Sequence, residues 1–229
     1  MAICGHLQPV PLLMHIVYII IAITVIASLR GFKDDNLVGK NLLVPYLVHN
    51  GRQRHRLFSY MIFHKDMGHL FFNMFSLYFL GQFLLNARGG HYIGVTYYDG
   101  LIQEYGPMAG QMVFLVLYVL GGLAATLIPM MRHKNNSYYS ALGASGAVSA
   151  VIFAALMWNP GMKLNIMFIP IGIPAYVFGP LYLLFEYYMD KRGGTNVGHD
   201  AHIGGALFGV IFAIFIQPEV ISRLLNEIF

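Results

Sequence analysis

The sequence predicts an all-α membrane protein, a single bundle of six transmembrane helices. Only 10% of its 229 residues are charged and 57% are hydrophobic, whereas soluble domains carry about a quarter charged residues. Six long stretches lack Asp, Glu, Lys and Arg, and each approaches or exceeds the roughly 20 helical residues that cross a hydrocarbon core. Lipid does not tolerate unpaired backbone groups, and the alternating ten-residue strands of a barrel are not seen, so we expect helices.

The expected spans are residues 10–29, 67–87, 107–131, 144–159, 170–189 and 201–218 of one membrane domain, residues 1–229. The first is expected to be a retained helix, because the residues before it lack the Lys and Arg that precede a cleaved signal peptide. The long connection 30–66 holds seven of the fourteen Lys and Arg residues and is expected at the membrane interface. The other connections are short, so successive helices should be antiparallel neighbours, with no internal repeat or separate soluble domain.

The charge pattern argues against one class of function, and the cysteine content excludes a disulfide-stabilised fold. The formal net charge is +4, and the basic residues are scattered, which argues against nucleic-acid binding. The single cysteine, Cys4, cannot form an internal disulfide. We expect no cofactor.

One serine stands out among the polar groups of the predicted spans, where such groups are costly and are therefore candidates for function. Ser145 lies in Ala141-Leu-Gly-Ala-Ser-Gly-Ala147, at the start of the fourth span. The N–H groups of a first helical turn lack intrahelical acceptors, so this end of a helix suits an oxyanion formed by attack on a carbonyl. Gly143 and Gly146 permit close approach, although small residues repeat every four positions from Gly146 and helix packing alone would explain them.

A histidine in the sixth span is the expected base. His202 precedes Gly205 by one helical turn and Gly209 by two, so the three share one face. If that face packs against the small residues of the fourth span, the imidazole comes within reach of Ser145. Serine is a poor nucleophile until a base takes its proton, so this pair is the minimum for acyl transfer. Asp200 should point elsewhere and no other carboxylate is obviously placed, which favours a Ser–His dyad over a triad.

The second span begins with a further pair of polar residues. His69 and Asn73 are four residues apart, so their side chains share one helix face and could donate to a common oxyanion. The alternative is an interfacial histidine beside an asparagine that binds a neighbouring helix.

Taken together, the motifs resemble those of the rhomboid intramembrane serine proteases. They are Gly143-Ala-Ser-Gly146, Ala201-His-Ile-Gly-Gly205 and His69-Leu-Phe-Phe-Asn73, in the fourth, sixth and second spans. The resemblance covers most of the chain and implies the minimal six-helix rhomboid-like bundle. It also implies an enzyme, a serine endopeptidase that hydrolyses peptide bonds in or near the transmembrane segments of membrane proteins.

The resemblance implies a role for each site residue. Ser145 would be the nucleophile and His202 the general base and then acid. The oxyanion hole would comprise His69, Asn73 and the N–H of Ser145, and the glycines that allow close helix packing would be Gly143, Gly146, Gly205 and Gly209.

The sequence departs from the family pattern at two places. The family's Trp-Arg pair in the first long connection corresponds to His55-Arg56, which keeps only the arginine. Ser149 stands where some relatives carry an aromatic ring that stacks on the catalytic histidine, so we expect the orientation of His202 to depend on helix packing.

The expected partners are transmembrane protein substrates and the lipid bilayer, and the expected location is an integral, multi-pass position in the bacterial inner (cell) membrane. Two criteria predict opposite orientations of the chain across the membrane. The loops that the family topology assigns outside carry 7 + 2 + 2 = 11 Lys and Arg residues against 3 inside, which is opposite to the positive-inside rule.

Two other functions fit parts of the pattern. A catalytically silent rhomboid-like binder would keep the helix packing and guide membrane proteins, although intact Ser145 and His202 argue against it. Alternatively, four histidines at short spacings, His64, His69, His199 and His202, could bind a metal; we expect no metal.

Overall fold

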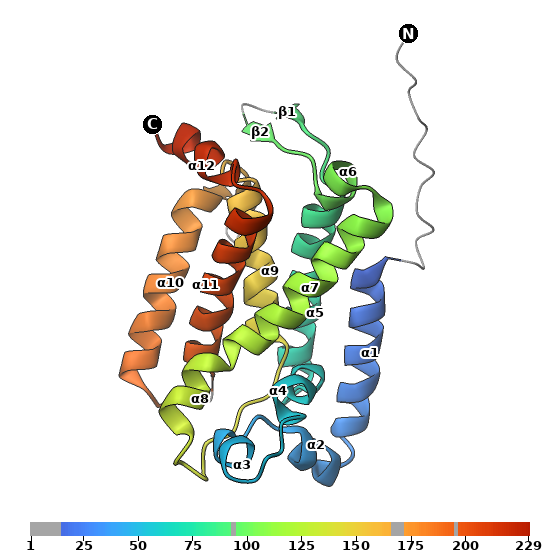
Figure 1. Ribbon diagram of the computed structural model, residues 1–229, viewed down its shortest axis with the longest axis vertical. Helices are drawn as coiled ribbons and strands as arrows, with labels where there is room; N and C mark the ends of the chain where they lie inside the picture. The colour runs from blue at the N-terminus through green and yellow to red at the C-terminus, as the bar shows by residue number, and fades with distance from the viewer. Residues whose placement is uncertain (1–14, 93–94, 166–171, 195–196) are drawn as a thin grey trace.

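The computed structural model describes residues 15–92, 95–165, 172–194 and 197–229. Within them, long helices lie side by side in a bundle, with short helices and two hairpins at its ends (Figure 1). The bundle helices are α1 (Ile16–Gly31), α5 (Met67–Asn86), α7 (Pro107–Ala125), α9 (Ser145–Trp158), α10 (Ala175–Arg192) and α11 (His199–Ile216), and α8 (Leu127–His133) continues α7.

Each of the six predicted spans overlaps one of these helices, although α1, α10 and α11 extend beyond the predicted limits. Among the described residues, three helical stretches are long and apolar enough to cross a membrane, namely Met67–Asn86, Pro107–His133 and His199–Ile216, whereas α1 and α9 are shorter apolar helices. Residues 10–14 of the first predicted span and 170–171 of the fifth lie outside the described residues. The structure therefore confirms a helical bundle, in which three of the described helical stretches have the length and hydropathy of membrane spans.

The fifth predicted span begins too early. Residues 172–174 form strand β4 (Gly172–Pro174), which pairs antiparallel with β3 (Lys163–Asn165). α10 begins only at Ala175, because Pro174 has an extended backbone, with ψ at 142°, and lacks the N–H that a preceding helical turn would need.

The remaining elements lie at the two ends of the bundle (Figure 1). Near the lower end in this view are α2 (Asp35–Asn41), α3 (Pro45–His49), α4 (Arg56–Ser59) and the 3₁₀ helix η2 (Tyr60–Ile62). At the upper end are the hairpin of β1 (Gly90–Tyr92) with β2 (Val95–Tyr97), α6 (Leu101–Tyr105) and α12 (Val220–Ile228).

Arg56 holds the long first connection together. Its buried guanidinium donates to the carbonyl oxygens of Gly39 and Leu42, at 2.9 and 2.8 Å, and to the side chain of Gln53 at 2.7 Å. His55 instead lies outside, with Nε2 3.0 Å from the carbonyl oxygen of Lys40. The retained arginine is therefore a structural anchor of this segment.

Helix α9 is the centre of the bundle. Eleven of its fourteen residues are buried, as expected of a helix that is apolar on all sides. Against α11 the two backbones approach closely, because a methyl group on Gly205 would overlap the carbonyl oxygen of Gly146, and one on Gly209 would overlap that of Ala150. This glycine seam aligns the first turns of the two helices.

Candidate functional site

Ser145 is the first residue of α9 and is half-buried. The two residues before it are held by hydrogen bonds from Gly143 N–H to the Tyr60 carbonyl oxygen, at 3.0 Å, and from Ala144 N–H to His64 Nε2, at 3.2 Å. In the part of the chain that the structure describes, the N–H groups of the first α9 residues, beginning with Ser145, have no acceptor and no capping side chain. They are thus available to an oxyanion.

His69, in the first turn of α5, lies beside the loop that leads to Ser145, and Asn73 follows it by one turn. Gly143 has a φ of 122°, and a methyl group there would lie 2.6 Å from Cε1 and 2.8 Å from Nε2 of His69, so the imidazole packs directly on this glycine. The buried Asn73 amide donates to the His69 carbonyl oxygen at 2.8 Å, and its second N–H remains for another acceptor.

His202 lies in the first turn of α11, across the seam from Ser145. A methyl group on Gly146 would lie 3.5 Å from the carbonyl oxygen of Ala201, so the residues next to the predicted nucleophile and base are in contact. Among the described residues, however, no hydrogen bond joins the Ser145 hydroxyl to the His202 imidazole. Catalytic hydrogen bonds are often long without substrate.

The sequence analysis missed Glu186, in α10. Its carboxylate lies 2.6 Å from Nδ1 of His199 and 3.1 Å from Nδ1 of His202. Only three α10 residues are buried, Ala175, Gly179 and Glu186. The signal was present in the sequence: a lone carboxylate in the apolar run 181–189 marks a functional site by default.

Asp200, the other nearby carboxylate, does not reach the imidazole of His202 through any hydrogen bond among the described residues. It accepts from the Ala201 N–H at 2.9 Å, and its second oxygen lies 4.0 Å from Arg132 and 3.9 Å from His133.

The four histidines considered as metal ligands fall into two groups. His64 and His69 pack edge to face with ring centres 4.9 Å apart, whereas His199 and His202 converge on Glu186. The group of potential ligand atoms in the described residues comprises Glu186, His199 and His202, with all three atoms within 4.8 Å of one another.

His64 supports the site from the loop before α5. Its Nδ1 lies 3.0 Å from the Ser28 hydroxyl, and its Nε2 accepts the Ala144 N–H. Burial, aided by the neighbouring His69, lowers its pKa to about 3. His64 is therefore neutral at physiological pH, as its acceptor role requires.

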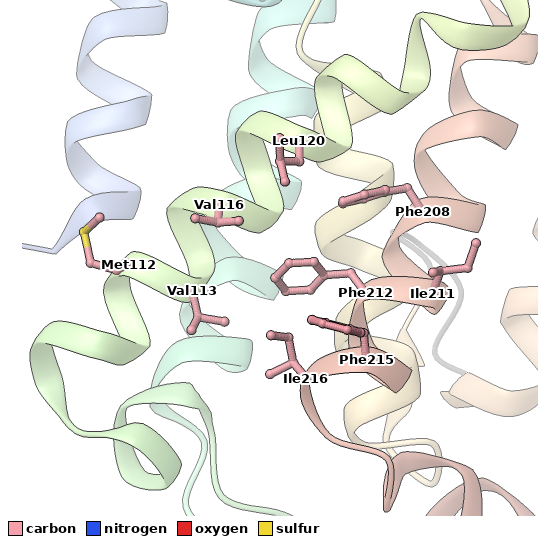
Figure 2. A pocket seen from close by; sticks show the side chains of 9 residues that line it. All are labelled: Met112, Val113, Val116, Leu120, Phe208, Ile211, Phe212, Phe215 and Ile216. Atoms are coloured by element: carbon pink, nitrogen blue, oxygen red, sulfur yellow. The ribbon is translucent and has the colours of Figure 1, made fainter.

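An apolar groove between α7 and α11 is separate from these polar groups. Figure 2 shows its lining, which includes Val116, Leu120 and Phe212 and no polar side chain. Such a surface offers no group for hydrolysis.

The comparisons with known proteins agree on one family. A family description named Rhomboid domain matches residues 51–219. The chain is similar to RHOMBOID-like protein 12, mitochondrial, of Arabidopsis thaliana, with 26% identity over 172 residues, 69% of this chain and 45% of that protein. It is also similar to Presenilin-associated rhomboid-like protein, mitochondrial, of Bos taurus, with 30% identity over 112 residues, 46% of this chain and 29% of that protein.

A third relative is an uncharacterized rhomboid protein, mitochondrial, of Schizosaccharomyces pombe, with 36% identity over 131 residues, 55% of this chain and 28% of that protein. The chain thus spans less than half the length of these relatives. The expectation of a bacterial inner membrane is wrong, because the relatives are named mitochondrial.

Proposed function

Because the chain belongs to the rhomboid family, we propose that it is an intramembrane serine endopeptidase with Ser145 as nucleophile and His202 as base. One observation carries the proposal. The glycine seam brings the first turns of α9 and α11 into backbone contact, at Gly146 with Ala201 and Gly205, and each turn carries one member of the pair.

The proposed reaction uses the groups around the start of α9. The Ser145 oxygen attacks the peptide carbonyl carbon while its proton passes to Nε2 of His202. The N–H of Ser145, with His69 and Asn73, stabilises the resulting oxyanion. The imidazolium then donates its proton to the departing amine, and water hydrolyses the ester by the same route.

We place this site within the membrane, in a bundle of six spans. α9 has 14 residues, hence a length of about 21 Å at 1.5 Å per residue, against a hydrocarbon core of about 30 Å. Ser145 would then lie below one membrane surface. The substrates would be transmembrane proteins, and the names of the relatives favour a mitochondrial membrane.

The test is cleavage of a model transmembrane substrate by the purified chain in liposomes. Ser145→Ala and His202→Ala should abolish cleavage, whereas Ser222→Ala, on α12 at the other end of the bundle, should not. Cleavage that persists in Ser145→Ala would refute the assignment.

A silent rhomboid-like binder is the second candidate. The observation that favours it is the lack of a hydrogen bond between Ser145 and His202 among the described residues. In the same liposomes, this candidate requires that the native chain bind the substrate and leave it intact.

A further inference from the structure

We propose that Glu186 is a positioning residue that fixes the orientation and tautomer of His202, the base of the proposed Ser145–His202 pair. The inference rests on the proposed serine endopeptidase function. The observation behind it is the pair of hydrogen bonds between the Glu186 carboxylate and two imidazoles, 3.1 Å to His202 and 2.6 Å to His199.

The tautomer follows from the chemistry of these contacts. Ionised carboxylate oxygens only accept hydrogen bonds, so Nδ1 of His202 must carry the proton that is donated to Glu186. In a neutral imidazole, Nε2 is then the acceptor, which is the state that a base needs to take a proton from Ser145. Without Glu186 nothing among the described contacts of His202 selects this tautomer.

The position of Glu186 in α10 supports a specific role. Its side chain is 5% exposed, while the adjacent Phe185 and Tyr187 are 55% and 53% exposed. This turn of α10 therefore buries its acidic residue and leaves its rings outside. A buried carboxylate is costly unless it is paired, so the arrangement is stable only with the histidines in place.

A second polar contact joins α10 to α9. The hydroxyl of Tyr182, one turn before Glu186 in α10, lies 3.5 Å from the Ser149 hydroxyl. Ser149 follows Ser145 by one turn of α9. This contact and the pairing of Glu186 with His202 connect α9, α10 and α11 beside the proposed base.

A shared metal ion explains the distances less well. Two ligands about 2.05 Å from a tetrahedral zinc ion lie about 3.4 Å apart. The 2.6 Å between Glu186 and Nδ1 of His199 is instead the length of a strong, charge-assisted hydrogen bond.

During the reaction, Glu186 would act through His202 only. When Nε2 takes the serine proton, the imidazole becomes a cation, and the carboxylate on the opposite side of the ring stabilises that charge. The proton on Nδ1 stays there, and the proton on Nε2 passes to the leaving amine.

Activity assays give the first test. Glu186→Gln should lower kcat by about 100- to 10,000-fold, since replacing the corresponding carboxylate of a serine protease triad costs about 10⁴, with little change in KM. Glu186→Asp should restore much of the loss. The matched control is Asp190→Asn, one turn further along α10, whose carboxylate pairs with Arg132; it should cleave like the native chain. Unchanged kcat in Glu186→Gln would overturn the inference.

The second test does not depend on catalysis. In ¹⁵N-histidine NMR spectra of the Ser145→Ala chain, assigned with a His202→Asn variant, neutral His202 should carry its proton on Nδ1. In Glu186→Gln, Nε2–H should appear. A proton on Nε2 of His202 in the Ser145→Ala chain itself would refute the inference. A His202 signal that changes when zinc is added and returns when a chelator removes the zinc would refute it too, because the histidine would then be a metal ligand. Failure of the native chain to cleave refutes the endopeptidase alone.

Discussion

Replacing Gly205 by alanine should separate the two helices that carry the proposed nucleophile and base. A methyl group there would overlap the carbonyl oxygen of Gly146 and lie 2.9 Å from its carbonyl carbon. Ordinary contact begins at 3.4 Å, so the carbon alone requires 3.4 − 2.9 = 0.5 Å of movement, and the oxygen requires more. The obstacle is backbone, so no side chain can move aside, and α11 must shift away from α9.

The shift should affect stability and activity together. Overpacking a tight interface costs about 1–3 kcal/mol, and misplacing reacting groups by about 1 Å costs about 100-fold in rate. We therefore expect Gly205→Ala to fold, to unfold at a lower temperature, and to cleave about 100-fold more slowly. The assay compares kcat and the thermal midpoint of purified native and variant chains in the same detergent.

The control is Gly179→Ala in α10. A methyl group there would lie 3.5 Å from Leu156 and 3.6 Å from Phe153, which is ordinary contact, and alanine favours a helix over glycine. This variant should match the native chain in kcat and stability. If Gly205→Ala also has the kcat and thermal midpoint of the native chain, the close approach of α9 and α11 is not what positions the site.

Three further predictions concern groups around the site. Burial lowers the pKa of His64 to about 3, so below about pH 6.5 the unfolded chain binds a proton that the folded chain does not. The contribution of neutral His64 to the free energy of unfolding should therefore be complete above about pH 6.5 and should fall by about 1.4 kcal/mol per pH unit toward pH 3. A denaturation series from pH 7 to 5 that is no steeper for the native chain than for His64→Gln would contradict this. Arg56→Ala should lower unfolding free energy by about 1–3 kcal/mol, because the carbonyl groups of Gly39 and Leu42 lose their donor; an unaltered thermal midpoint would count against it. Asn73→Ala should lower kcat by about 10- to 1000-fold, and a native rate would remove Asn73 from the oxyanion hole.

The helices of the bundle were predictable because each carries a long uncharged run. The limits of α10 were not, because the residues before it are apolar and rich in proline and glycine. An apolar run of this kind fits a buried strand or a helix equally well. Only the pairing of Gly172 with Asn165 decides between them, and pairing depends on where the chain folds back.

The candidate site was predictable where motif and helix spacing coincide. Ser145 begins a helix, His69 and Asn73 share a face, and Gly205 meets Gly146. These relations follow from the period of a helix and from the small size of glycine.

Glu186 was missed for a physical reason. The predicted fifth span, residues 170–189, includes this glutamate, but its spacing within one helix does not show which residues of another helix it faces. The carboxylate is buried inside the bundle because His199 and His202 pair with it. That compensation comes from another helix and is visible only when α10 and α11 are packed together.

The most direct measurement is covalent labelling of the nucleophile. The purified native chain is treated with a fluorophosphonate probe, which reacts with activated serines, and the adduct is located by peptide mass spectrometry. We expect one adduct, on Ser145, that disappears in His202→Ala. No adduct on Ser145, or equal labelling of it in His202→Ala, would contradict activation of this serine across the seam between α9 and α11.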